Sequence, residues 1–134
     1  MYLLDTNVWL ERLLDQDKSP DVGKFLDRIP SDQIFITDFA FHSIALILCK
    51  FKRIETLKKF VEDVFVYGSV SLIHLGPEDM GKIISTIEEF SLDFDDAYQY
   101  IAADKHHLRL ISFDSDYDRT KLGKKTPAEV LLSG

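Results

Sequence analysis

The sequence predicts an α/β fold in which helices cover both faces of a central, mostly parallel sheet, a three-layer α/β/α arrangement. Short apolar runs that are typical of strands alternate along the chain with longer segments whose apolar residues recur at helical spacing. Most of the strand candidates are plain apolar runs, as expected for parallel strands covered on both sides. The chain has 134 residues, the length of one domain, so we expect a single domain over residues 1–134.

The first half of the chain contains two strand candidates, and each is followed at once by residues that begin a helix. Residues 5–7 (DTN) follow the first run and residues 37–38 (TD) follow the second, and these residue types cap helix N-termini. Residues 19–20 (SP) begin another helix, because proline fits the first helical turn. The expected elements are a strand at 2–4, helices at 7–14 and 19–29, a strand at 33–36, and helices at 37–49 and 54–66.

The second half of the chain continues this alternation. Residues 77–79 (PED) have the composition of a helix start, and the aspartate-rich stretch at 93–96 precedes a long helical segment. An apolar run then leads directly into a second acidic stretch. The expected elements are a strand at 70–75, helices at 77–90 and 93–107, a strand at 108–112, and a short helix at 127–132.

The charge balance narrows the range of partners. Sixteen basic and 23 acidic residues give a net charge of −7, which argues against a general nucleic-acid coat protein or a polybasic membrane binder. No apolar run approaches the roughly 20 residues that span a bilayer, and the N-terminus lacks the basic start of a signal peptide. The single cysteine, Cys49, excludes a disulfide framework and is interpreted as a small buried residue. We therefore expect a cytoplasmic protein with no membrane partner.

Aspartates stand at the carboxyl ends of the predicted strands. Asp5 follows the first strand, Asp38 the second, and Asp114 and Asp116 the last, while Asp96 lies at the start of the helix that leads to the last strand. Ligands bind at this edge of open α/β sheets, and carboxylates that converge there repel one another unless a cation intervenes. Mg²⁺ or Mn²⁺ takes such oxygen ligands, activates a bound water and neutralises a phosphate oxygen. The sequence therefore predicts a carboxylate-bound metal centre that acts on a phosphate ester.

Each of these aspartates also has a purely structural interpretation. Asp93 and Asp96 have the spacing of a helix cap and a first-turn acid, and Asp5 suits a cap as well. Asp114 and Asp116 suit a turn. Their shared place at one edge of the sheet favours the metal centre over a set of unrelated caps.

A basic cluster follows the last aspartates and indicates a nucleic-acid contact. Positive charge a few residues from the predicted metal centre would lie where a phosphate chain has to pass. An acidic protein can bind RNA locally in this way when a metal ion neutralises its acidic centre. The predicted RNA-binding residues are Arg119, Lys121, Lys124 and Lys125.

Three segments of the chain together resemble the PIN domain. They are LLDTNVWLERLL at the start, LDFDDAYQYIAA in the middle and LRLISFDSDYD near the end, and their order and spacing agree with the family over essentially the whole chain. The resemblance implies a parallel sheet between helices and a Mg²⁺- or Mn²⁺-dependent ribonuclease site. Many small members are VapC-like toxins of toxin–antitoxin pairs. The resemblance therefore also implies hydrolysis of RNA phosphodiesters, an antitoxin partner and a homodimer.

The resemblance further assigns roles to individual residues. The implied metal ligands, the first three of them also catalytic, are Asp5, Asp96, Asp114 and Asp116. The implied supporting positions are Thr6, Asn7, Ser112 and Asp93.

The chain departs from the family at one position. PIN nucleases usually carry a glutamate on the helix after the second strand, but here that position falls at or next to His42-Ser43. Asp38, one turn earlier, and Asp93 are the substitutes that the sequence offers. Without the glutamate, the alternative function is a catalytically weak or inactive PIN-like module that binds RNA or protein. A phosphoacceptor receiver domain fits poorly, because the first strand does not end in a carboxylate pair.

Overall fold

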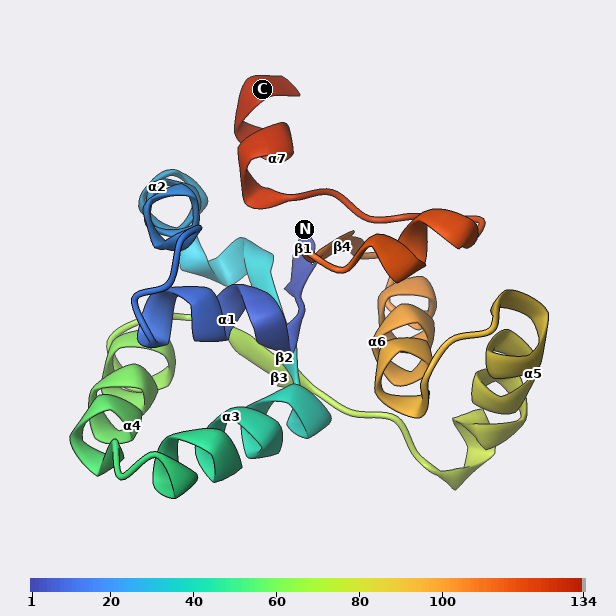
Figure 1. Ribbon diagram of the computed structural model, residues 1–134, viewed down its shortest axis with the longest axis horizontal. Coiled ribbons are helices and arrows are strands. Elements are labelled where there is room, and N and C mark those ends of the chain that lie inside the picture. The colour runs from blue at the N-terminus through green and yellow to red at the C-terminus, as the bar shows by residue number, and fades with distance from the viewer. Residues whose placement is uncertain (134) are drawn as a thin grey trace.

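The computed structural model describes residues 1–133 and confirms the three-layer α/β/α fold (Figure 1). Its sheet has four parallel strands in the order β3-β2-β1-β4. They are β1 (Tyr2–Leu4), β2 (Ile34–Thr37), β3 (Ser71–Ile73) and β4 (Arg109–Ile111). Leu3 pairs with Phe35 on one side and Leu110 on the other. The carboxyl ends of the two middle strands β1 and β2, and of β4, therefore lie at one edge of the sheet.

Seven α-helices in the described residues cover the two faces of the sheet (Figure 1). One face packs against α5 (Met80–Phe90) and α6 (Phe94–Lys105), in a core that includes Leu3 and Leu110. The opposite face carries Leu4 and Ile111 and packs against the remaining helices. These are α1 (Thr6–Leu13), α2 (Ser19–Arg28), α3 (Asp38–Lys50), α4 (Ile54–Val61) and α7 (Pro127–Ser133).

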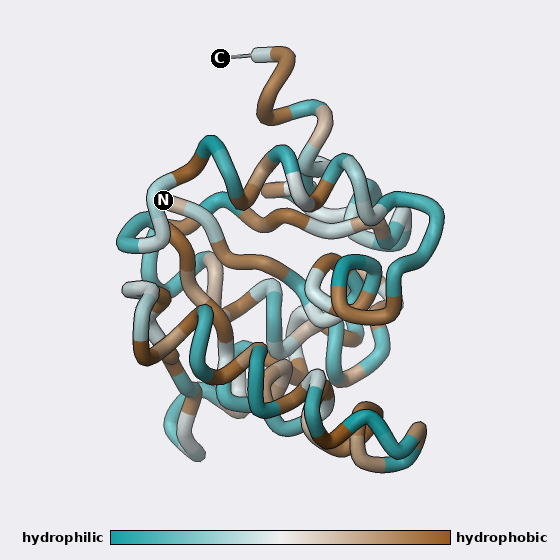
Figure 2. Tube along the Cα trace, turned by 90° about the vertical axis from the view of Figure 1, so that its left-hand side faces the viewer, coloured by the Kyte–Doolittle hydropathy of each residue, from teal (hydrophilic) through white to brown (hydrophobic). Residues whose placement is uncertain are grey.

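Hydropathy along the chain follows this layering. In Figure 2 hydrophobic segments run through the middle of the molecule, and hydrophobic and hydrophilic residues alternate along the surrounding helices. Adjacent strand residues alternate between the two cores, because successive side chains of a strand point to opposite faces. This explains why β1 is apolar throughout: Leu3 and Leu4 are both fully buried, one in each core.

Several predicted boundaries are wrong in detail. The helix expected at 54–66 ends as α4 at Val61 and continues as a π-helical turn, Glu62–Val66, which brings Phe60 and Phe65 together with a ring-centroid distance of 6.1 Å. The helix expected at 77–90 begins with a 3₁₀ turn at Pro77–Asp79, and the strand expected at 70–75 is limited to β3. The helix expected at 93–107 is α6, which stops before His107, a residue with φ of 56°.

Cys49 corrects another expectation. It lies near the end of α3 and is exposed rather than buried, because the buried positions of that helix are Ala40, Ile44 and Leu48, which recur four residues apart and leave position 49 on the outer side. Among the described residues, no helix has the length and apolar character needed to cross a bilayer.

Candidate metal centre

A cavity of about 350 Å³ lies at the carboxyl edge of the sheet, between the N-terminal turns of α1, α3 and α6. Four of its lining side chains are carboxylates, from Asp5, Asp95, Asp96 and Asp114, and none is basic. The other lining residues are Thr6, Asn7, Leu10, Phe39, Ser43, Ile47 and Gln99. The strand-to-helix connections thus bring together carboxylates from the two ends of the sequence, as the sheet topology predicted.

Asp5 is the most deeply buried of these carboxylates, with 5% of its surface exposed. It caps α1, and its Oδ1 accepts hydrogen bonds from the backbone N–H of Thr6 (2.8 Å) and from Nε2 of Gln99 (3.1 Å). Its Oδ2 accepts a hydrogen bond from the Ser112 hydroxyl (2.8 Å). Burial raises the pKa of Asp5 in spite of these hydrogen bonds. Asp5 therefore combines the predicted cap with a fixed orientation in the cavity.

Asp96 lies in the first turn of α6 and is 9% exposed. Burial, reinforced by the negative charges of Asp114, Asp95 and Asp5, raises the pKa of Asp96 to about 7. The hydroxyl of Tyr117 donates a hydrogen bond to Oδ1 of Asp96 (3.3 Å). This carboxylate therefore lies among like charges, which a bound cation would neutralise.

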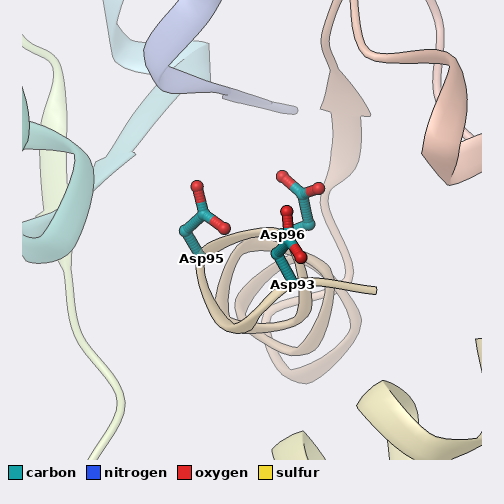
Figure 3. Close-up of side chains that lie close together, drawn as sticks. All are labelled: Asp93, Asp95 and Asp96. Atoms are coloured by element: carbon teal, nitrogen blue, oxygen red, sulfur yellow. The ribbon is translucent and has the colours of Figure 1, made fainter. Parts of the chain in front are cut away.

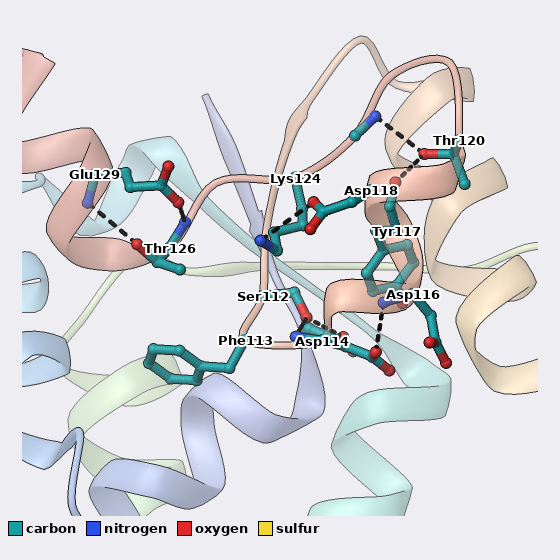
Figure 4. A network of polar contacts seen from close by, with 12 residues as sticks. Ser112, Phe113, Asp114, Asp116, Tyr117, Asp118, Thr120, Lys124, Thr126 and Glu129 are labelled. Atoms are coloured by element: carbon teal, nitrogen blue, oxygen red, sulfur yellow. Dashed lines mark hydrogen bonds and ion pairs between the residues drawn. The ribbon is translucent and has the colours of Figure 1, made fainter.

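Asp114 is placed by a network that joins the ends of β1 and β4 (Figure 4). The Ser112 hydroxyl accepts hydrogen bonds from Nδ2 of Asn7 (3.2 Å) and from the backbone N–H of Asp114 (3.0 Å). Oδ1 of Asp114 in turn accepts from the backbone N–H of Asp116 (2.9 Å), at the start of a 3₁₀ turn over Ser115–Arg119. Carboxylate oxygens of Asp96, Asp114 and Asp116 all lie within 4.8 Å of one another. Asp114 and Asp116 therefore form a turn and also lie close to Asp96.

Three carboxylates stand at the start of α6, from its N-cap residue Asp93 and from Asp95 and Asp96 in its first turn, and oxygens of all three lie within 4.8 Å of one another. Figure 3 shows that Asp93 and Asp96 stand side by side, whereas Asp95 is set apart from them. Asp95 lines the cavity and Asp93 does not. Asp93 occupies the N-cap position of α6 without a side-chain capping hydrogen bond. The cavity-facing neighbour of Asp96 is therefore Asp95, a residue that sequence reasoning did not select.

The two substitutes considered for the missing glutamate lie outside the cavity lining. Oδ1 of Asp38 accepts hydrogen bonds from the Tyr98 hydroxyl (2.7 Å) and from the backbone N–H of Phe39 (2.8 Å). Asp38 is thus engaged in holding α3 against α6. From α3 the cavity receives Ser43, while His42 is exposed and absent from the lining. No carboxylate of α3 reaches this cavity in the described residues.

The four basic residues predicted to bind RNA also lie outside the cavity lining. Arg119 donates from Nε to the Phe90 carbonyl (3.1 Å) and from Nη2 to the Ser91 carbonyl (2.8 Å), and its Nη1 lies 3.2 Å from Oδ1 of Asp116. Lys124 pairs with Asp118 at 3.3 Å, and only 13% of its side chain is exposed. Lys121 and Lys125 are exposed. The 3₁₀ turn after Asp114 therefore directs these side chains toward α5 and the β4 edge.

Two uncharged residues of the site were missed by sequence reasoning. Gln99 is 1% exposed, donates to Asp5 and accepts a hydrogen bond through Oε1 from the Thr37 hydroxyl (2.6 Å). It lies three residues after Asp96 on the same helix face, a spacing that could have identified it. Tyr117 is fully buried beneath the carboxylates. Nothing in its local sequence indicates that position.

The donor set of the cavity fits a hard divalent cation. Carboxylate oxygens are the ligands that Mg²⁺ and Mn²⁺ prefer, and these ions keep several waters that an open cavity can accommodate. Because no lysine, arginine or histidine lines the cavity, its negative charge is left uncompensated by the chain itself. A thiolate- or imidazole-seeking ion such as zinc would find neither ligand in this lining.

Comparison with known proteins gives a family and a set of similar folds. The family model of the PIN domain matches residues 2–122, whereas no curated protein matches the sequence. A toxin–antitoxin complex from Klebsiella pneumoniae is similar, with a TM-score of 0.76 and 19% identity, over 96% of this chain and 99% of that chain. VapC20 from Mycobacterium tuberculosis, a sarcin–ricin loop cleaving toxin, gives a TM-score of 0.76 at 12% identity, over 91% of this chain and 96% of that chain. FitAcB from Neisseria gonorrhoeae gives a TM-score of 0.72 at 19% identity, over 95% of this chain and 98% of that chain.

Proposed function

This chain belongs to the PIN domain family, and from that premise we propose that it is a Mg²⁺- or Mn²⁺-dependent endoribonuclease that hydrolyses RNA phosphodiester bonds. The observation that carries the proposal is the cavity in which Asp5, Asp95, Asp96 and Asp114 converge without a basic side chain. Such a set of carboxylates is destabilising on its own and becomes favourable when a divalent cation binds. Its place at the carboxyl edge of a parallel sheet is where this class of fold binds its ligands.

In this proposal Asp5, Asp96 and Asp114 hold the ion, with Asp116 as an additional carboxylate in reach of Asp96 and Asp114. The bound ion supplies Lewis acidity, which lowers the pKa of a bound water and stabilises negative charge on a phosphate. Gln99 and Ser112 orient Asp5 through their hydrogen bonds to its two oxygens. Asp96, whose pKa is raised to about 7, would have to be ionised to hold the ion. Thr6 and Asn7 support the site through the α1 cap and the bond to Ser112.

The biological setting is proposed from the similar structures, which include a toxin–antitoxin complex and a sarcin–ricin loop cleaving toxin. We infer that this chain acts as a single-domain cytoplasmic toxin that an antitoxin protein neutralises. A complex of FitAB with a DNA fragment, similar at 16% identity and a TM-score of 0.74, supports an antitoxin partner of the same kind. A homodimer is part of the proposal, and exposed apolar side chains of α3 and α4, such as Leu46 and Ile54, are available for it.

The metal centre is tested by calorimetric titration of Mn²⁺ into the purified protein, followed by cleavage of single-stranded RNA. We expect Asp96→Asn to reduce Mn²⁺ affinity at least about tenfold and to abolish cleavage, because the substitution removes a charged ligand. Asp104→Asn is the matched control, since Asp104 is an exposed aspartate near the other end of the same helix. Cleavage that persists in Asp96→Asn, or an equal loss in both variants, would reject this centre.

A second candidate function is a PIN-like module that binds RNA or protein without cutting, and the observation that favours it is Ser43. This serine lines the cavity from α3, where the family pattern leads us to expect a glutamate. Asp95 is the carboxylate that the cavity offers from α6 instead. If Asp95 compensates, Asp95→Asn lowers Mn²⁺ affinity and cleavage while Asp93→Asn changes neither. RNA retention by the wild type without turnover at any Mn²⁺ concentration would favour the binding module.

A further inference from the structure

Three aromatic rings form a cluster beside the carboxylate cavity. Phe39 from the first turn of α3 lies 6.1 Å from Phe94 and 5.3 Å from Tyr98, measured between ring centroids, and Phe94 lies 6.2 Å from Tyr98. Phe39 lines the cavity together with the carboxylates. Phe94 is the first residue of α6, directly before Asp95 and two residues before Asp96, and 43% of its surface is exposed. An exposed aromatic ring therefore adjoins the proposed metal centre.

Hydrogen bonds fix this cluster in place. The buried Tyr98 donates its hydroxyl proton to Asp38 (2.7 Å) and accepts a hydrogen bond from the backbone N–H of Leu75 (2.8 Å). The same Asp38 oxygen accepts from the backbone N–H of Phe39. The rings of Phe39 and Tyr98 are thus held between α3, α6 and the segment after β3. Phe94 rests on this fixed support while its outer surface stays open, which gives a preorganised apolar platform.

The charge distribution indicates what such a platform would bind. The chain has a net charge of −7, and two of the four basic residues that follow Asp114 in the sequence are engaged in ion pairs, Arg119 with Asp116 and Lys124 with Asp118. Affinity for a polyanion from phosphate contacts is therefore limited near the cavity. Stacking of bases on aromatic side chains is the other principal source of affinity for single-stranded nucleic acid, and every base has a face that can stack.

We propose that Phe94, supported by Phe39 and Tyr98, stacks against an unpaired nucleobase next to the scissile phosphate. Such stacking needs an unpaired base, because the bases of a duplex are stacked on one another and unavailable to a side chain. This inference rests on the proposed ribonuclease function and adds to it a residue that binds the substrate. It assigns Phe94 to substrate binding, while the carboxylates carry the chemistry.

Binding is tested by fluorescence anisotropy with a labelled single-stranded RNA and with the same strand in a duplex. The titration is done in Ca²⁺, a cation that carboxylates also bind, with a gel to confirm that the strand stays intact. We expect Phe94→Ala to weaken binding of the single strand about five- to a hundred-fold and Phe94→Trp to retain it. Phe51→Ala is the control, because Phe51 is an exposed phenylalanine at the far end of α3. In Mn²⁺, Phe94→Ala should raise KM and leave kcat nearly unchanged.

The outcomes separate this inference from the proposed function. Wild-type protein that neither binds nor cleaves RNA rejects the proposed function, and the stacking site with it. Wild-type protein that binds single-stranded RNA equally well after Phe94→Ala rejects only the stacking site. Preference for the duplex over the single strand would also overturn it. So would a Phe94→Ala variant that changes the oligomeric state in size-exclusion chromatography but not the RNA affinity, since the ring would then be a protein contact.

Discussion

At the scale of single residues, the carboxylates depend on uncharged neighbours that fix their orientation. Gln99 links Asp5 to the end of β2, because its amide group donates to Oδ1 of Asp5 and accepts from the Thr37 hydroxyl. All three of these side chains are buried. Removal of the amide would leave the Thr37 hydroxyl proton without an acceptor and would take one of the two donors from Oδ1 of Asp5. Gln99 is therefore a positioning residue for the proposed metal centre.

We expect Gln99→Leu to lower the free energy of unfolding by about 1–3 kcal/mol, the cost of a buried polar group left without its partner. Urea denaturation monitored by circular dichroism measures this change. Gln33→Leu serves as the control, because Gln33 is exposed at the end of the turn before β2, and its substitution should be nearly neutral. If the two variants unfold at the same urea concentration, the amide does not hold Asp5 and Thr37 together.

At the scale of elements, the sequence predicts existence and order better than boundaries. Both ends of the strand at residues 2–4 are predicted correctly, since an apolar run meets the acidic cap Asp5. The helix end near Val61 could not be predicted, because the π-helical turn that follows it packs Phe65 against Phe41 and Phe60. The contact of Phe65 with Phe41 joins segments that lie far apart in the sequence. The missed site residues Asp95 and Tyr117 share that cause, since only the folded chain shows which aspartate of a run faces the cavity.

The end of α5 offers a test of local backbone conformation. Ser91 follows the helix with φ of 55° and ψ of 45°, in the left-handed region that favours glycine. We expect Ser91→Gly to stabilise the protein by about 0.5–1 kcal/mol, because relief of the backbone strain exceeds the added entropy of the unfolded chain. Thermal unfolding in EDTA checks the change. Ser85→Gly, at an exposed position inside α5, should instead destabilise the protein by about 0.5 kcal/mol. Equal effects at both positions would show that the left-handed conformation of Ser91 is not strained.

At the scale of the whole molecule, stability of the fold favours separation of like charges, whereas the site brings carboxylates together. The parallel sheet between helices was predictable from the sequence, whereas the strand order was not. That order, β3-β2-β1-β4, gathers the residues after β1 and β4 at one edge. The position of the basic residues in the fold could not be predicted from their proximity to Asp114 in the sequence. Arg119 is used to join the turn after Asp114 to the end of α5. In the proposed metal centre a cation from outside the chain would neutralise the acidic edge, which would link stability to both pH and metal.

The sign of this dependence follows from Asp96 and Asp5, whose pKa values are raised in the folded chain from an ordinary value of 3.8, that of Asp96 to about 7. Between about pH 4 and pH 7 the folded protein holds more protons than the unfolded chain, so the free energy of unfolding falls as the pH rises through this range. Asp79 acts in the opposite sense but in another range. Its pKa is lowered by the Gly76 N–H and by Lys105, so its contribution is lost only below about pH 4.

We therefore expect the melting temperature in EDTA to fall from pH 5 to pH 8, and Mn²⁺ to restore it most strongly at pH 8, where the ion no longer competes with protons for Asp96. At a concentration of a hundred times its Kd, Mn²⁺ would raise the free energy of unfolding by about 2.7 kcal/mol. Asp96→Asn removes the titrating group, so its melting temperature in EDTA should exceed that of the wild type at pH 8 and respond little to Mn²⁺. Differential scanning calorimetry of both proteins from pH 5 to pH 8, with and without Mn²⁺, measures the four curves. Parallel curves for the two proteins in EDTA would show that Asp96 does not carry the raised pKa, whereas equal stabilisation of both by Mn²⁺ would place the ion elsewhere.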